Sequence, residues 1–283
     1  ATTGPLAALP FAALPTAPPG AGEPAWLARQ LALSQVPSVT AWLALRQLPP
    51  ARPAPEPLLA WADPAYPRPG SVAPGSRRTG ASLPPLPETR DEALAIAGAL
   101  RARPERDLLL GPQATRDSVL AASRSGELAR RRVVVFATHG LTAGDLPGLA
   151  QPALALAPPG GSVDALDGLL GLDDILSLKL NADWVVLSAC NTAAGDGQAE
   201  EALSGLARGF LYAGSRSLLV THWAVETESA KRLTTRTFEH RAAQPQARKA
   251  ESLRQAMLEL MAQPRYAHPA FWAPFALVGE GGP

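Results

Sequence analysis

The hydrophobic and polar positions of this chain follow two different patterns, which meet near residue 88. Nineteen of the 30 prolines lie in residues 1–87. A proline inside a helix removes a backbone hydrogen bond and clashes with the preceding turn, so this part is predicted to hold no long helix. We expect short strands and loops there, with one helix over 38–48, a strand over 58–62 and a loop over 65–87.

Beyond residue 88, apolar residues recur at helical spacing in some segments and form short continuous runs in others. Thr89 and Glu92 have the spacing of a capping box, in which two side chains satisfy each other's backbone amides at the start of a helix. Helices are predicted over 89–100, 115–122, 172–178, 200–213, 227–240 and 248–261, and strands over 108–110, 133–138, 184–190, 217–221 and 274–278. Strands that alternate with helices indicate an α/β fold with a mostly parallel sheet covered on both faces.

Two of these strands end in residues that can act together chemically. Strand 133–138 is followed by His139, and strand 184–190 ends at Cys190, the single cysteine of the chain. The carboxyl ends of parallel strands meet at one edge of a sheet, where an imidazole can stabilise a thiolate and later protonate a leaving amine. A histidine 51 residues before the cysteine (190 − 139) also matches the spacing known for caspases. The alternatives are a cysteine that is only a small buried hydrophobe and a histidine hydrogen-bonded in the core.

Composition and charge narrow the classes of function. No apolar run reaches the ~18 residues of a membrane helix, and the proline-broken segment 1–20 has no basic leader, so neither a membrane anchor nor a signal peptide is predicted. The net charge is +1, and the cluster 130–132 is interpreted as a solvated strand start rather than a nucleic-acid site. One cysteine cannot form an internal disulfide, which fits a cytoplasmic location. Because the chain begins with Ala1, we expect a piece of a longer protein, with 1–283 as a single domain.

The remaining histidines and glycines indicate no cofactor. His222, His240 and His268 are scattered along the chain and lack the spacing of metal ligands. Residues 195–197 lack the third glycine and the strand–helix context of a dinucleotide-binding loop. We therefore predict neither a metal nor a cofactor.

Several motifs resemble those of the CHAT domain family, caspase-like peptidase domains often found behind tetratricopeptide repeats. Residues 136–140, FATHG, resemble the family's histidine motif, and residues 185–192, VVLSACNT, resemble its cysteine motif. Further similarity lies at 6–14, 36–38, 83–97, 201–214, 223–225 and 268–275. The resemblance therefore covers nearly the whole chain, although Ala202 stands where glycine is usual.

This resemblance implies a caspase-like three-layer α/β sandwich that acts as a cysteine endopeptidase. It implies that Cys190 attacks the peptide carbonyl while His139 transfers the proton. The backbone N–H groups of Gly140 and Cys190 are the candidates for the oxyanion hole, since Gly140 lets a substrate backbone approach closely. The expected partners are a protein or peptide substrate and a regulatory repeat domain or activating partner. A further interpretation is an enzyme that is held inactive until a partner or a cleaved segment releases it. The rival interpretation is a catalytically silent domain that binds a partner through the same cleft.

The acidic residues Glu226 and Glu228 are the candidates for substrate recognition. They lie in a stretch where relatives carry an acidic pair, although Thr227 occupies the second position of that pair here. By resemblance to separase-like enzymes, an acid at this place receives a basic P1 side chain, so cleavage after Arg or Lys is expected. The alternative is that both glutamates only cap and solvate the first turn of a helix.

Overall fold

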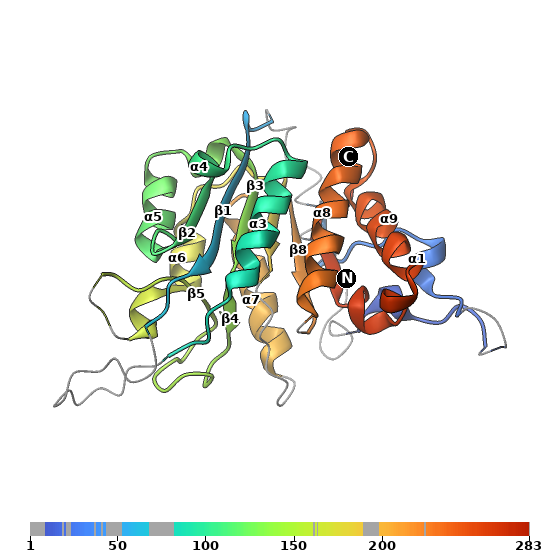
Figure 1. Ribbon diagram of the computed structural model, residues 1–283, viewed down its shortest axis with the longest axis horizontal. Coiled ribbons are helices and arrows are strands. Elements are labelled where there is room, and N and C mark those ends of the chain that lie inside the picture. Colours follow the sequence, from blue (N-terminus) through green and yellow to red (C-terminus); the bar gives the residue numbers. More distant parts are fainter. Residues whose placement is uncertain are drawn as a thin grey trace.

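The computed structural model describes most of the chain (Figure 1), namely residues 9–18, 20, 24–36, 38–40, 42–43, 53–67, 82–160, 162, 164–188, 198–223 and 225–282. A six-stranded sheet in the order β2-β1-β3-β7-β8-β9 lies at its centre. Its strands are β1 (Glu56–Pro64), β2 (Leu108–Gly111), β3 (Arg131–Ala137), β7 (Trp184–Leu187), β8 (Ser217–Thr221) and β9 (Phe275–Gly279). All neighbours run parallel except β8 and β9, so the predicted, mostly parallel sheet is confirmed.

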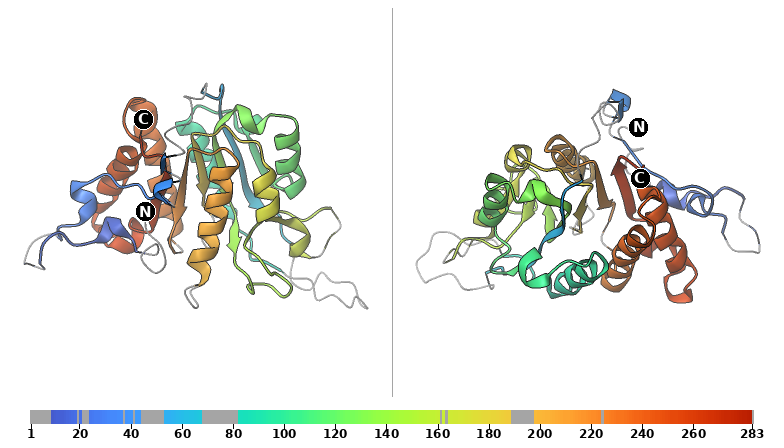
Figure 2. Two further views of the ribbon diagram at one scale, coloured as in Figure 1. Left: turned by 180° about the vertical axis from the view of Figure 1, so that it is seen from behind. Right: turned by 90° about the horizontal axis from the view of Figure 1, so that it is seen from above.

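Helices cover both faces of this sheet, as the view from above in Figure 2 shows. One face carries α3 (Pro87–Ala99), α8 (Thr227–Ala243) and α9 (Lys249–Met261), and the other carries α5 (Arg116–Arg124), α6 (Leu172–Ser177) and α7 (Gln198–Tyr212). Successive side chains of a strand point to opposite faces, which explains why Leu58 and Ala60 join the first cluster while Leu59 and Trp61 join the second. The protein is therefore a three-layer α/β sandwich with an apolar core on each side of the sheet.

Aromatic side chains fill the core between the sheet and α7. The rings of Trp61 and Phe136 are stacked with centroids 5.2 Å apart, and Phe136 lies 5.4 Å from Phe210. All three are fully buried. The indole nitrogen of Trp61 donates a hydrogen bond to Ser118 Oγ at 2.9 Å, so no polar atom of the ring is left unsatisfied.

A second, small sheet follows the end of β3. It consists of the antiparallel strands β4 (His139–Leu141), β5 (Ala153–Ala155) and β6 (Leu169–Gly171) in that order. Strands of three residues are too short to produce a readable alternation, and none of them was predicted. Their consequence is that the residue after Thr138 does not enter a free loop but starts a new strand.

The segment that precedes β1 packs along α9 and β9. It contains a 3-10 turn, η2 (Phe11–Ala13), and the short helix α1 (Leu27–Gln30). Arg254 of α9 donates hydrogen bonds to the carbonyl oxygens of Ala28 at 2.9 Å and Arg29 at 2.6 Å. Gln35 bridges to Val278 of β9 in parallel orientation. These contacts attach the proline-rich part to the same core as the regular part.

The capping box expected at Thr89 and Glu92 is wrong. The helix begins two residues earlier, at Pro87, whose fixed φ suits the first helical position. Thr89 instead donates to the Leu86 carbonyl at 2.7 Å and accepts the Asp63 amide at 2.8 Å. Glu92 points away from the helix start, toward β7 and α8.

Two other expectations need comment. In the helix expected over 38–48, residues 39–40 and 42–43 are helical, and residues 41 and 44–48 lie outside the described residues. The cluster 130–132 is not simply solvated, because Arg131 is buried and its guanidinium donates to Asp107 at 2.6 Å and to the Leu58 carbonyl at 2.8 Å. The remaining predicted helices and strands are found with shifts of a few residues at their ends. Residues 189–190 of the strand expected over 184–190 and residues 68–81 of the loop expected over 65–87 lie outside the described residues.

Candidate active site

His139 lies at the carboxyl edge of the central sheet. Strand β3 ends at Ala137, and His139 begins β4 two residues later, with 2% of its surface exposed. The neighbouring strand β7 is in register with β3, so that Leu187 is paired with Phe136. Ser188, which follows Leu187, therefore lies at the same edge of the sheet as the segment that carries His139.

One backbone carbonyl fixes the orientation of the His139 ring. The Nε2 atom lies 2.8 Å from the carbonyl oxygen of Pro84, in the segment before α3. A carbonyl oxygen only accepts hydrogen bonds, so Nε2 carries the proton and Nδ1 keeps its lone pair. Burial lowers the pKa of His139 below its ordinary 6.5, while the Pro84 carbonyl and Glu88 oppose the shift. The ring is therefore a neutral base at neutral pH, with its free nitrogen defined.

A hydrogen-bonded tyrosine supports the histidine from the side. Tyr66 packs against His139 with ring centroids 5.5 Å apart. Its hydroxyl donates to the Ala155 carbonyl of β5 at 2.8 Å and lies 2.8 Å from Thr138 Oγ1. Burial raises the pKa of Tyr66 to about 12, so its hydroxyl stays protonated as a donor. The strand β4 is thus held in place at its first residue.

The other predicted catalytic groups are placed only in part. Gly140, the candidate oxyanion residue, is the buried second residue of β4. Cys190, the predicted nucleophile and the second oxyanion candidate, lies outside the described residues, as do 195–197. The last described residue before it is Ser188, directly after β7.

A pocket of about 80 Å³ opens beside His139. Polar side chains from the small sheet, α3, the end of β7 and the start of α8 line it, among them Glu88, Glu92, His139, Ser188 and Thr227. Apolar side chains such as Leu86, Val225 and Phe275 complete the wall. A recess of this kind beside a candidate base is where a substrate side chain would bind.

Glu92 forms the most buried polar part of this pocket. It is 5% exposed, and its two oxygen atoms accept hydrogen bonds from Ser188 Oγ at 2.7 Å and from Thr234 Oγ1 at 3.0 Å. Burial raises its pKa, and the two hydroxyl bonds oppose the shift. The sequence analysis assigned Glu92 to a capping box and did not predict this position. Its helical phase, three residues after the buried Thr89 and four before the buried Ile96, is the signal that could have placed it toward the core.

Glu226 and Glu228 lie at the first turn of α8. Glu226 caps the helix by accepting the Ser229 amide at 2.8 Å, and Arg265 lies 3.6 Å from its other oxygen. Glu228 forms ion pairs with Lys231 and Arg232, both at 2.8 Å, which hold its pKa below the ordinary value. The structure thus gives both carboxylates contacts of the capping and solvating kind. Their part in substrate binding stays a prediction.

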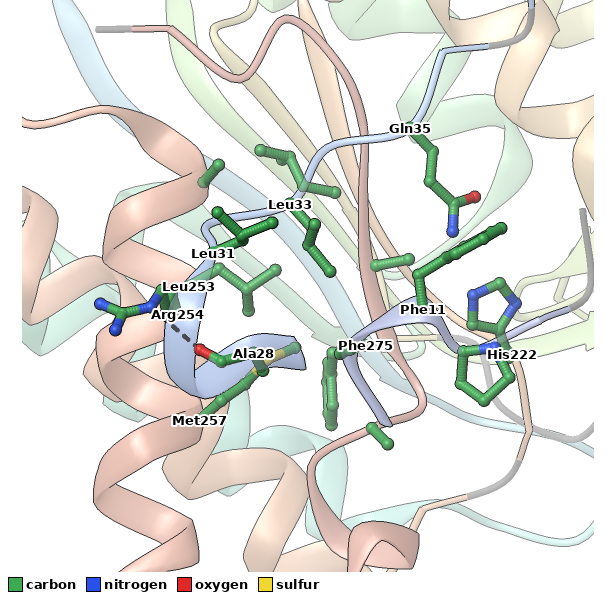
Figure 3. Close-up of a pocket in the computed structure, with 16 residues that line it drawn as sticks. Phe11, Ala28, Leu31, Leu33, Gln35, His222, Leu253, Arg254, Met257 and Phe275 are labelled. Atoms are coloured by element: carbon green, nitrogen blue, oxygen red, sulfur yellow. Dashed lines mark hydrogen bonds between the residues drawn. The ribbon is translucent and has the colours of Figure 1, made fainter. Parts of the chain in front are cut away.

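A second pocket, shown in Figure 3, is smaller and mostly apolar. Its volume is about 30 Å³, and it lies where the segment before β1 packs on α9 and β9, between side chains such as Phe11, Leu253 and Phe275. His222 reaches its edge, and burial lowers the pKa of that histidine. Within the described residues its Nε2 atom has no hydrogen-bond partner. We interpret this pocket as a packing seam, because the described residues that line it include no nucleophile, and Arg254 among them is hydrogen-bonded to the carbonyl oxygens of Ala28 and Arg29.

The other histidines occupy structural positions. His240 is hydrogen-bonded to Glu259 at 2.9 Å between α8 and α9, and His268 Nδ1 accepts the Ala270 amide at the start of a 3-10 turn. In the part of the chain that the structure describes, no three His, Cys, Asp or Glu side chains are grouped closely enough to hold a metal ion. In the same part, no helix combines the length and apolar character needed to cross a bilayer.

The order of the sheet, its helices on both faces and the buried histidine at its carboxyl edge define a three-layer α/β domain with a candidate base at the edge of the sheet. The model of the CHAT domain family matches residues 1–280. The chain therefore belongs to the CHAT domain family.

Two curated relatives are named for their tetratricopeptide repeats. Tetratricopeptide repeat protein 28 of Mus musculus is 27% identical over 223 residues, and its Homo sapiens counterpart is 26% identical over 223 residues. Each alignment covers 69% of this chain, but only 9% of the mouse protein and 8% of the human protein. The chain therefore spans less than a tenth of the length of these relatives.

Among solved structures, the Arg-specific cysteine proteinase gingipain R is similar with a TM-score of 0.45 and 10% identity, over 81% of this chain and 47% of that one. The complex of the pro- and mature domains of Porphyromonas gingivalis RgpB gives a TM-score of 0.45 and 12% identity, over 81% of this chain and 48% of that one.

Proposed function

We propose that this domain is a cysteine endopeptidase in which His139 and Cys190 form the catalytic pair. The observation that carries the proposal is the His139 ring, fixed through Nε2 by the Pro84 carbonyl at the edge of the sheet where β7 ends. In the register of β3 and β7, Phe136 is paired with Leu187. His139 and Cys190 each lie three residues beyond that pair (139 − 136 and 190 − 187), which supports their meeting at this edge.

The chemistry follows from the protonation state of the histidine. The Nδ1 lone pair accepts the proton of the Cys190 thiol, and the thiolate attacks the carbonyl carbon of the scissile peptide. The Gly140 and Cys190 amides are proposed to donate to the oxyanion. The imidazolium then protonates the leaving amine, and water hydrolyses the acyl-enzyme. The Pro84 carbonyl stabilises the imidazolium, because its bond to Nε2–H strengthens when the ring is charged.

The proposed substrate is a protein or peptide, with a preference for a basic residue at P1. The sequence predicts an acid near the cleft for this side chain, with Glu226 and Glu228 as its candidates. In the structure, however, Glu226 caps α8 and Glu228 pairs with Lys231 and Arg232. The repeat-containing relatives support an association with a repeat domain that regulates access. The proposal also keeps the cytoplasmic location that a single cysteine favours.

The second candidate function is a domain that binds a partner without cleaving it. It is favoured by the relatives, which are named for their repeats and not for peptidase activity. Both candidates use the same cleft, so only chemistry at the thiol separates them.

A thiol-directed peptidyl electrophile tests the proposal. We expect a peptidyl chloromethyl ketone with Arg at P1 to alkylate the wild-type protein once, at Cys190. The rate of this reaction relative to that of free cysteine should be much higher than the same ratio measured with iodoacetamide. A peptide library incubated with the protein should give defined cleavage sites. If the ketone reacts no faster than with free cysteine and no library peptide is cleaved in the presence of the natural neighbouring domains, the binding domain is the correct function.

A further inference from the structure

Resting on the proposed function, we infer that Glu92 is the residue that receives the basic P1 side chain of the substrate. The pocket that Glu92 lines also contains His139 and Ser188. Ser188 lies two residues before Cys190 in the sequence (190 − 188). Nearness to His139 and, in the sequence, to the proposed nucleophile favours the P1 residue as the one whose side chain enters this pocket.

The charge of the pocket suits a cation. Glu88 and Glu92 both line it, one helical turn apart on α3, and the lining residues in the described part include no lysine or arginine. Within the same described part, no ion pair involves Glu92. Thr138 and Thr227 add two polar residues to the lining.

Each oxygen of Glu92 is used once and can accept more. The bonds from Ser188 and Thr234 account for one hydrogen bond per oxygen, whereas a carboxylate offers about four acceptor sites. A guanidinium or ammonium that enters the pocket would meet an oriented acceptor whose geometry is already fixed. Burial raises the pKa of Glu92, and a cation bound beside it would favour the charged form of the carboxylate.

The size of the pocket fits the end of a long side chain. A volume of about 80 Å³ holds several water molecules, which the head group of Arg or Lys would displace. Glu226 and Glu228 do not line this pocket, since one carboxylate caps α8 and the other pairs with Lys231 and Arg232. Val225 and Thr227 from the same stretch do line it. The acid at the binding position is thus supplied by α3.

Two peptides that differ only by Arg or citrulline at P1 test this assignment. Citrulline has nearly the shape of Arg but no charge, and a buried carboxylate left without its cation is unfavourable. We expect wild type to cleave the Arg peptide with a kcat/KM about 10²-fold higher. In Glu92→Gln this ratio should fall close to one, while the citrulline peptide is cleaved within about tenfold of the wild-type rate. Glu226→Gln and Glu228→Gln, the matched controls, should keep the wild-type ratio.

Several outcomes would overturn the assignment. These are a wild-type enzyme without a preference for Arg over citrulline, an unchanged ratio in Glu92→Gln, and an equal loss on both peptides, which would mark Glu92 as structural. If Glu92→Gln does not fold, Glu92→Asp replaces it as the test variant, because it keeps the charge and should keep a preference for Arg. A natively folded Glu92→Asp protein without that preference would contradict the inference. A protein that cleaves neither peptide and does not react with the electrophile refutes the proposed function itself, which is a distinct result.

Discussion

Lys249 provides a test of the structure that is independent of catalysis. It is the first residue of α9 and is 1% exposed. Within the described residues its Nζ atom has no hydrogen-bond partner, and the nearest carboxylate oxygen of Glu280 lies 3.9 Å away. Burial lowers the pKa of Lys249 from 10.5 to about 8, with Asp183 and Glu280 opposing the shift. The charged form of Lys249 therefore lowers the free energy of unfolding of the protein.

The magnitude follows from the pKa values. Between about pH 8 and 10.5 the unfolded chain binds more protons than the folded one, so the stability contributed by this residue rises with pH across that window. At roughly 1.4 kcal/mol for each tenfold change in proton affinity, the full rise is about 3 kcal/mol. The Lys249→Met variant lacks this titration, and we expect it to be more stable than wild type at pH 7 by up to about 3 kcal/mol.

Urea denaturation of both proteins at several pH values between 7 and 10 measures the difference. The advantage of Lys249→Met should be largest at pH 7 and shrink steadily above pH 8. Lys231, which is paired with Glu228 and has a raised pKa, provides the control. Lys231→Met should change stability by no more than about 1 kcal/mol, without this trend. A difference for Lys249→Met that is constant with pH, or a large destabilisation at every pH, would refute the reasoning.

Three further predictions concern the site and the core. Cys190→Ala should abolish peptide cleavage and leave the circular dichroism spectrum unchanged, so full activity in this variant would remove the nucleophile assignment. His139→Ala should lower kcat/KM by more than ~10²-fold and slow the alkylation of Cys190 near pH 7, whereas equal alkylation rates would mean that the imidazole does not activate the thiol. Phe136→Ala should lower the free energy of unfolding by about 3–5 kcal/mol, because it empties the space between Trp61 and Phe210. A urea midpoint within experimental error of wild type would contradict that packing.

Most of the central sheet could be predicted from the sequence, because its strands are continuous apolar runs that alternate with clearly periodic helices. The runs 133–138 and 217–221 correspond to β3 and β8, and helix 227–240 to α8. Such runs are apolar on both faces, so their burial needs no knowledge of the partners. His139 could be chosen from the sequence as a candidate site residue, because it closely follows one of these predicted strands.

The remainder of the site depends on contacts that leave no local pattern. The Pro84 carbonyl that orients His139 belongs to the backbone, and any residue there would supply it. Thr89 and Glu92 fit a capping box by spacing, but Pro87 starts the helix earlier and the tertiary contact with Ser188 and Thr234 decides where Glu92 points. Local sequence signals were outweighed by partners 96 and 142 residues away.

The bridge between Gln35 and β9 has a consequence for how the protein can be shortened. Strand β9 is the last strand of the sheet, and an uncovered edge strand offers its amides and carbonyls to any other extended chain. The amide of Gln35 bonds to Leu277 at 2.8 Å, and its carbonyl accepts the Gly279 amide at 2.7 Å. A fragment that starts at β1 lacks Gln35, so it would expose the Leu277 carbonyl and the Gly279 amide of β9. It would also expose the apolar side chains that α1 covers. Such a fragment should retain the sheet yet self-associate in solution, with a sedimentation coefficient that grows with protein concentration.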